Sequence, residues 1–219
     1  TLQTLTLLRS MSAYCASASV MAVRSLSFSS TACTRTPERP SIRSFVFSCP
    51  ALSMTLRTSS VLAALSADPR NADLILALAS EGRSAGPPPD WQRLMLTTLV
   101  NSGEYEKAYS VWRKLTKAPD LRAGFYNPTF ADTRAAPPFN WELAQGSGGV
   151  AEPRSGGLQV IYFGRENVDL ARQVLLLPPA RYRVAMPLSG DLSEDNGISW
   201  NVICLGANRE LYELPLRGP

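Results

Sequence analysis

The chain has 219 residues, of which 45% are hydrophobic and none is histidine, and its formal net charge is +4. The length allows one large domain or two small ones. The lack of histidine excludes Ser-His-Asp and Cys-His catalysis, and any histidine-ligated metal, within this chain. No run of 18 apolar residues occurs, so no transmembrane segment is predicted.

The excess positive charge is confined to residues 1–50, which hold five Arg, no Lys and one acidic residue, Glu38. Residues 51–219 hold 17 basic and 17 acidic residues and are therefore neutral. A protein that binds DNA or RNA needs a basic face in its folded part. We therefore expect no nucleic-acid partner.

Residues 1–54 form a separate low-complexity region rich in Ser and Arg. Their first 50 positions hold 11 Ser and 6 Thr but no Lys and no Asp. This composition is typical of an organellar transit peptide, and equally of a disordered tail without a periodic apolar face. A third interpretation is an upstream extension foreign to the natural protein, with Met54 closer to the true start.

Helical periodicity covers residues 55–119. Helices are predicted after a Ser-rich cap at 58–60, over Ala72–Ala79, over Trp91–Asn101 with Asp90 as N-cap, and over Glu104–Lys117. The last helix has the broadest apolar face at 3.6-residue spacing. That face consists of Tyr105, Ala108, Tyr109, Val111, Trp112 and Leu115.

The last two of these helices resemble a tetratricopeptide repeat. The similarity lies in the Gly103–Ala108 turn and helix start, in Trp112 four residues later, and in Pro119 closing the unit. Residues 67–72 resemble the end of one repeat running into the next, with an insertion near 86–89. The resemblance covers roughly residues 61–119 and implies helical hairpins that dock a protein partner. This small number of helices cannot bury a core alone. We therefore expect either that more repeats lie upstream or that the helices dock on the β region.

Residues 120–138 are predicted to be a linker with turn and extended signals. Its aromatic residues, Phe125, Tyr126 and Phe130, are expected to hold it against a surface. Residues 139–219 then show short apolar runs separated by Gly, Pro and Asn-Gly signals. Strands are predicted at 139–145, 158–163, 171–177, 181–188, 198–204 and 210–216.

The predicted fold class is α+β, with N-terminal helical hairpins followed by an antiparallel β-sandwich or jelly roll at 139–219. Five or six strands fall short of the eight of a jelly roll, so we expect an incomplete sandwich. An exposed strand edge then invites a partner strand.

The β region resembles a carbohydrate-binding jelly-roll module. Such modules stack sugars on Tyr and Trp and use Arg and Asn for the hydroxyl groups. Strand phase places Trp141, Tyr182 and Trp200 on the core face, so burial of Trp141 and Trp200 tests stacking by them. The candidate ligand-binding residues are Arg181, Arg183, Asn201, Tyr162 and Tyr212.

Other chemistries find little support in the sequence. The acidic residues 191–195 crowd a hairpin and match no calcium loop, and Gly146–Gly149 is not followed by the helix that a phosphate loop needs. Cys204 is expected to be a buried small hydrophobic residue, and no C-x-x-C pair occurs. The sequence therefore predicts no enzyme, no cofactor and no metal.

We therefore expect a non-catalytic interaction or scaffold protein with a β-sandwich binding module. Its helices would bind a protein partner, and its β module a partner or a glycan. The resemblance implies a protein of the bacterial cell envelope or periplasm. An alternative function is an accessory carbohydrate-binding fragment of a carbohydrate-active enzyme, and an alternative location is an organelle reached through a transit peptide.

Overall fold

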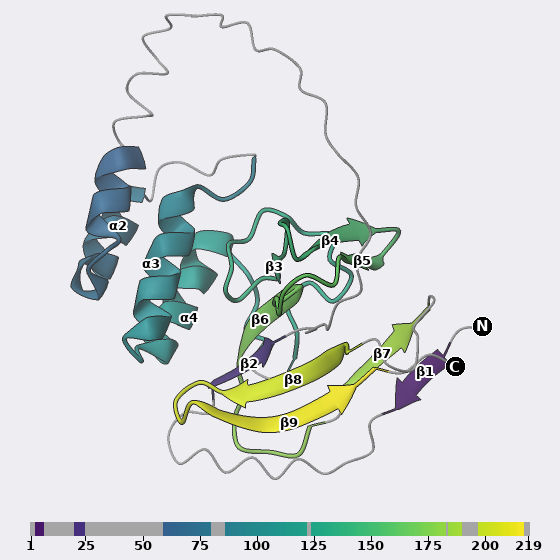
Figure 1. The fold of residues 1–219 in the computed structure, drawn as a ribbon. Helices are drawn as coiled ribbons and strands as arrows, with labels where there is room; N and C mark the ends of the chain where they lie inside the picture. The colour runs from purple at the N-terminus through teal and green to yellow at the C-terminus, as the bar shows by residue number, and fades with distance from the viewer. Residues whose placement is uncertain are drawn as a thin grey trace, which may run out of the picture.

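The structure, a computed structural model, describes residues 3–6, 20–24, 59–79, 86–121, 124–182, 184–189 and 197–216. Helices gather on one side of the molecule and strands on the other (Figure 1). The chain is therefore a mixed α+β protein, as predicted. Within the described ranges, no helix is long and apolar enough to cross a membrane.

The helical part lies where the periodicity placed it. A first helix covers residues 59–65 and is followed by η1 (Pro69–Asn71), α2 (Ala72–Ala79), α3 (Asp90–Asn101) and α4 (Tyr105–Thr116). Asp90 was predicted to be an N-cap, but it is the first residue of α3, and no side chain caps this helix. Its negative charge still lies in the first turn, where it interacts favourably with the positive end of the helix dipole.

Helix α4 joins the helices to the strands. Its predicted apolar face is confirmed in Ala108, Tyr109, Val111 and Trp112, which are all buried. These side chains share one hydrophobic core with the segment 135–139 and with β6 (Ala171–Leu176). Of the two alternatives for burying the helices, docking on the β region is therefore the one observed.

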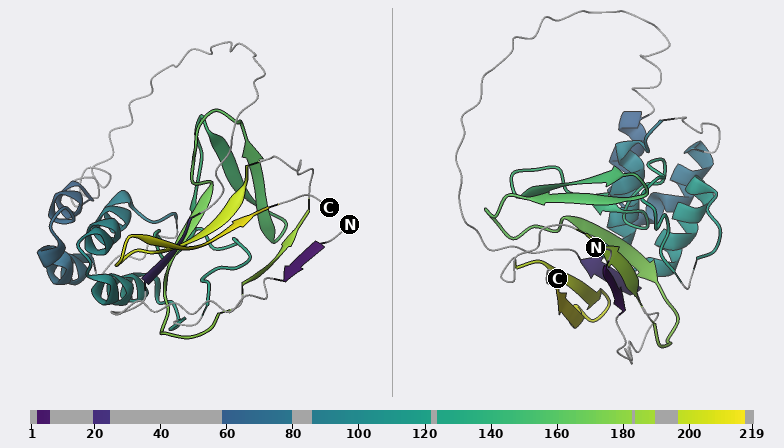
Figure 2. Two further views of the ribbon diagram at one scale, coloured as in Figure 1. Left: turned by 60° about the horizontal axis from the view of Figure 1, so that its bottom comes forward. Right: turned by 90° about the vertical axis from the view of Figure 1, so that its right-hand side faces the viewer.

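The described strands form three antiparallel sheets. A five-stranded sheet has the order β3-β6-β2-β8-β9, and two-stranded sheets are formed by β1 with β7 and by β4 with β5. The β4–β5 hairpin lies in a separate layer from β2, β6 and β8 (Figure 2, right). The bounds are β1 Gln3–Thr6, β2 Val20–Arg24, β3 Glu142–Leu143, β4 Gly149–Arg154, β5 Gly157–Tyr162, β6 Ala171–Leu176, β7 Ala185–Leu188, β8 Ser199–Cys204 and β9 Arg209–Pro215.

The predicted order of helices first and strands second is wrong at two places. β1 and β2 belong to the N-terminal 54 residues, and β2 lies in the centre of the large sheet, between β6 and β8. Strand pairing between such distant segments leaves no local pattern in the sequence. The remainder of residues 1–54 lies outside the described ranges, so the targeting and extension interpretations stay predictions.

The first predicted strand is also mostly wrong. Only Glu142–Leu143 of the predicted stretch 139–145 forms a regular strand, and Phe139 belongs instead to a turn at residues 137–139. Phe139 is therefore buried against the helices, at 2% exposure. Trp141 packs elsewhere, so the two rings do not share one strand face.

A strand that the sequence did not predict, β4, begins at Gly149. A Cβ atom there would lie 2.5 Å from Leu170 Cδ2 and 2.9 Å from the Ile161 carbonyl oxygen, so only glycine allows this close approach. Pro153 is tolerated in β4 because it lies opposite Leu158 in a pair that exchanges no hydrogen bonds. Its missing N–H group therefore removes no bond to β5.

The later strands follow their predicted positions, although β7 is shorter than the 181–188 expected. Cys204 is fully buried, as predicted, and it is disulfide-bonded rather than a free thiol. Residues 158–163 are apolar at both alternating sets of positions, which is the pattern of a strand covered on both faces, but only one face of β5 is covered. Ile161 and Phe163 are 51% and 43% exposed, and only the opposite side, with Val160 and Tyr162, packs against the core.

Candidate functional site

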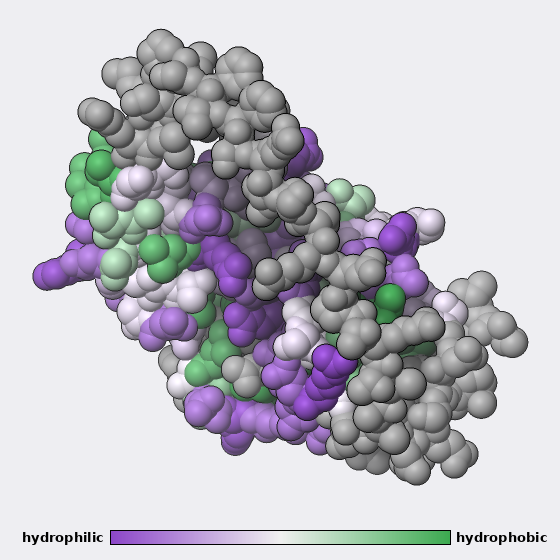
Figure 3. Space-filling model, turned by 45° about the horizontal axis from the view of Figure 1, so that its top comes forward, coloured by the Kyte–Doolittle hydropathy of each residue, from purple (hydrophilic) through white to green (hydrophobic). Residues whose placement is uncertain are grey.

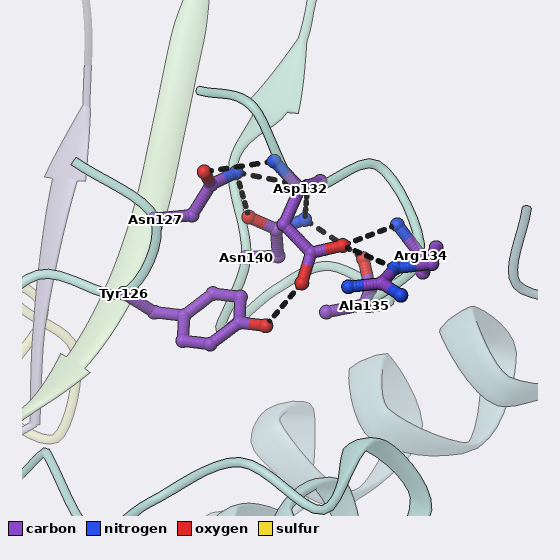
Figure 4. A network of polar contacts seen from close by, with 6 residues as sticks. All are labelled: Tyr126, Asn127, Asp132, Arg134, Ala135 and Asn140. Atoms are coloured by element: carbon purple, nitrogen blue, oxygen red, sulfur yellow. Dashed lines mark hydrogen bonds and ion pairs between the residues drawn. The ribbon is translucent and has the colours of Figure 1, made fainter. Parts of the chain in front are cut away.

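The segment between the helices and β3 is built around a compact polar network (Figure 4). The Asn127 side chain donates to the Asp132 carbonyl at 2.8 Å and to Asn140 Oδ1 at 3.1 Å, and it accepts from the Asp132 N–H at 3.0 Å. Asn140, 4% exposed, donates to the carbonyls of Asp132 and Ala135, both at 2.9 Å. These bonds replace the secondary structure that the segment lacks.

The Asp132 carboxylate is the only charged acceptor in this network. Tyr126 Oη donates to it at 2.7 Å, and Arg134 donates its backbone N–H at 2.9 Å and its Nε at 3.2 Å. Burial by itself would raise the pKa of Asp132, but the hydrogen bonds from Tyr126 and Arg134 outweigh it, so this pKa lies below its usual value. The side chain is therefore ionised at neutral pH.

Aromatic rings line the same segment, as predicted for Phe125, Tyr126 and Phe130. Trp141 stacks on Phe125 at a centroid distance of 5.6 Å and contacts Phe130 at 4.8 Å and Trp200 at 6.4 Å. Trp141 and Trp200 are both half-buried rather than fully buried. Full burial would have excluded sugar stacking by these two residues, and neither residue is fully buried.

A cavity of about 220 Å³ opens beside this network. Four parts of the chain contribute to it: the start of α3, the 127–141 segment, β3 and β4. Its chemically active lining residues are Arg93, Phe130, Asp132, Thr133, Trp141 and Glu142. Cationic, anionic, hydroxyl and aromatic groups thus meet in one cavity, which is hereafter called the cleft.

Glu142 ties the charged side of the cleft to both halves of the molecule. Arg93 of α3 donates to Glu142 Oε1 at 2.7 Å, and Arg172 of β6 donates to Glu142 Oε2. The Glu142 side chain is 21% exposed, whereas that of Arg93 is 61% exposed. Arg93 therefore keeps N–H groups directed at solvent while its position is held.

Phe130 adopts a backbone conformation that is unusual for a bulky residue, with φ at 58°. Such a conformation costs about 1–3 kcal/mol and persists only where the surroundings enforce it. Here the turn bond from the Phe130 N–H to the Asn127 carbonyl, at 3.0 Å, and the contact with Trp141 hold the residue in place. The result is a ring fixed at the wall of the cleft.

The residues predicted from sequence to bind a ligand lie apart from the cleft. Tyr162 belongs to the cluster around Leu170 and donates its hydroxyl to the Glu166 carbonyl at 3.0 Å, whereas Tyr212 packs in the separate cluster around Leu175. Arg181 is exposed.

Asn201 accepts from the Ser199 hydroxyl at 3.0 Å. The β8–β9 register pairs Asn201 with Glu213 and Val202 with Tyr212, so Asn201 and Tyr212 face opposite sides of the sheet. Arg183 lies outside the described residues. The described members of the predicted set therefore do not converge on one site.

Sequence reasoning missed the cleft because the start of α3, residues 127–143 and β4 come together only in the folded chain. The turn signals of the linker 120–138 were recognised, but nothing local links Arg93 to Glu142, 49 positions away. In the part of the chain that the structure describes, no group of three or more Cys, Asp or Glu side chains is placed to hold a metal ion.

Comparison with known proteins places the chain in no family, since no family model, no curated protein and no solved structure matches it.

Proposed function

We propose that the protein is a non-catalytic interaction protein whose helical part binds a helical segment of a protein partner. The observation that carries this proposal is the exposure of α2. Its sequence, Ala-Asp-Leu-Ile-Leu-Ala-Leu-Ala, is apolar nearly all round. Ala72 and Ile75 are fully buried, but Leu74 and Leu78 are 50% and 52% exposed.

A helix that is apolar all round belongs in an environment that covers it on every side. Leu74 and Leu78 are four residues apart and therefore lie on one face. Val61 of the preceding helix, 56% exposed, adds to the apolar surface of this pair of helices. Apolar surface reaches solvent on the helical side of the molecule, at the left of Figure 3.

The chemistry of the partner follows from the way the helices already stack. The 59–79 helices pack through Leu62 and Ile75 onto the core that they share with α3 and α4. A further pair of helices on the open side of α2 would continue this stack in the manner of tetratricopeptide-like hairpins. The occupant is therefore an amphipathic helix or helical hairpin of a partner protein.

Site-specific photo-crosslinking tests this proposal. A benzoylphenylalanine at position 78 is expected to capture a partner through a helical segment, whereas the same group at exposed Glu213 of β9 is not. A synthetic peptide of the captured segment is then titrated against the whole chain. Burying two leucines is worth about 1.5–3 kcal/mol each, so Leu74→Lys with Leu78→Lys is expected to weaken binding at least tenfold. Equal binding by this variant would contradict the proposal.

A second candidate function, the binding of a sugar residue of a glycan, is favoured by the cleft. Phe130 offers a fixed ring, Arg93 and Thr133 offer donors, and Glu142 and Asp132 offer acceptors. Because both charge signs are present, this lining suits a neutral polyhydroxyl ligand better than an ion. The volume corresponds to roughly seven waters at about 30 Å³ each, which is the size of one sugar ring.

Saturation-transfer NMR with glucose, galactose and mannose tests this second candidate. We expect Phe130→Ala to abolish the transfer and Tyr212→Phe to leave it unchanged, because Tyr212 lies outside the cleft. Absence of saturation transfer to all three sugars would rule out a monosaccharide site. Loss of transfer in Tyr212→Phe would indicate that the sugar binds at the β8–β9 face and not in the cleft.

A further inference from the structure

Strand β5 is an edge strand without the usual protection. Neither β5 nor Phe163, which directly follows it, carries a charge or a proline, and five of the six residues 158–163 are Leu, Val, Ile, Tyr or Phe. Strand β9, at the outer edge of the five-stranded sheet, carries instead Arg209, Glu210, Glu213 and Pro215. Charged residues and proline on an edge strand hinder its pairing with other chains. Strand β9 has this protection, whereas β5 lacks it.

The hydrogen bonds of the hairpin show which backbone groups of β5 remain available. The Phe163 N–H donates to the Gly148 carbonyl at 3.0 Å, and β5 pairs residue by residue with β4. In an antiparallel ladder alternate residues point toward and away from the neighbour. The N–H and C=O groups of Leu158 and Val160 therefore point away from β4, and no other described residue pairs with them.

The exposed side chains of β5 lie beside this open edge. Ile161 and Phe163, 51% and 43% exposed, are two residues apart and share one face of the strand. An unpaired backbone edge and an exposed apolar face on one uncharged strand are the two requirements for strand addition.

We propose that β5 pairs with β5 of a second copy of the chain, antiparallel, with the two-fold axis at Val160. This register places Phe163 of one copy opposite Gly157 of the other, where an aromatic ring covers the bare glycine backbone. It also places Ile161 opposite Gln159. The pairing is self-complementary, so it closes with two copies and leaves no free β5 edge.

The lack of charge along the pairing stretch permits this self-pairing. Gly157 to Phe163 carries no charged side chain, so two copies bring no like charges together in any antiparallel register. The charged side chains at the hairpin turn have partners within their own strand, since Arg154 pairs with Glu152 of β4 at 3.1 Å.

Sedimentation velocity over a wide range of concentration tests the dimer. The whole chain is expected to dimerise reversibly, and Ile161→Lys to weaken dimerisation at least tenfold, because it places a charge on the paired face. The control is Leu94→Lys, since Leu94 is a 42% exposed apolar residue of helix α3. A wild-type chain that stays monomeric, or a dimer that Ile161→Lys leaves unchanged, would overturn the proposal.

Cysteine crosslinking tests the register and the identity of the occupant. A mixture of the Gln159→Cys and Ile161→Cys chains is expected to form the 159–161 intermolecular disulfide, because directly opposed Cα atoms lie about 4.5–5.5 Å apart. Ile161→Cys alone is expected to form far less of the 161–161 bond. Peptide mass spectrometry separates these bonds from any formed by the native cysteines. A dimer without the 159–161 bond, or β5 occupied by an extended peptide from another protein, would refute self-pairing.

Discussion

Asp132 shows how a single residue organises a segment that lacks regular structure. Its backbone N–H and C=O pair with Asn127 and Asn140, and its carboxylate accepts from Tyr126 and Arg134. The pKa of the carboxyl group is lowered in the folded state because these hydrogen bonds outweigh burial. As the pH falls, Asp132 therefore binds a proton in the unfolded chain before it does so in the folded protein. The ionised carboxylate stabilises the fold fully only above about pH 4.

We predict that Asp132→Asn lowers the free energy of unfolding by about 1–3 kcal/mol at pH 7. The difference between variant and wild type should begin to shrink below about pH 4, where Asp132 of the unfolded chain takes up a proton, and continue to shrink until the lowered pKa of native Asp132 is passed. Urea denaturation at a series of pH values measures both effects. Asp73→Asn is the control, because the Asp73 side chain is 81% exposed and should have little effect. A difference as large at pH 3 as at pH 7 would show that the charge is not the cause.

At the scale of elements, Glu142 connects three of them. It lies in the short strand β3, accepts from Arg93 of α3 and accepts from Arg172 of β6. Surface ion pairs contribute little to stability, but Glu142 is only 21% exposed and has a cation on each carboxylate oxygen. This group therefore fixes the position of α3 against the sheet and holds one side of the cleft.

Glu142→Gln is expected to lower the free energy of unfolding by about 1–2 kcal/mol, because it leaves two cations without their common anion. The matched control is Glu152→Gln, since Glu152 pairs with Arg154 at the surface and both side chains are well exposed. That change should cost less than about 0.5 kcal/mol. Denaturation of the two variants side by side measures the difference, and equal effects would mean that the Arg93–Glu142–Arg172 group is no stronger than a surface pair.

For the whole molecule, the helices share a hydrophobic core with strand β6, while the other strands pack in two smaller clusters. Trp112 of α4, 1% exposed, contacts Tyr109, Tyr126 and Phe139 and donates its Nε1–H to the Ala136 carbonyl at 3.0 Å. Val174 and Leu176 of β6 are buried in the same core. Neither part can lose its packing without exposing the other.

We predict that helix content and tryptophan fluorescence follow a single unfolding transition, as expected for a cooperative unit. Trp112→Ala should lower stability by about 3–5 kcal/mol through the cavity that it leaves, and it should shift both signals together. Circular dichroism and fluorescence during one thermal scan provide the measurement. Two separate midpoints in the wild-type chain would indicate that residues 59–119 and 124–216 fold independently.

The sequence by itself determined the elements whose signal is local. Helix α4 was found because its buried residues recur every 3.6 positions, and β6 because its apolar run is bounded by turns. The neutral charge balance of residues 51–219 was likewise a property of composition alone. These features need no knowledge of which distant residues meet.

Only the tertiary structure decided what depends on distant contacts. Phe139 packs in the core of the helices whereas Trp141 packs on the rings of the linker, β2 enters the sheet from the far end of the chain, and Arg93 meets Glu142 across 49 positions. Ile161 and Phe163 looked like core residues in a run that is apolar on both phases, yet they are exposed. The physical reason is that periodicity states which residues share a face, whereas burial of that face depends on which other part of the chain packs against it.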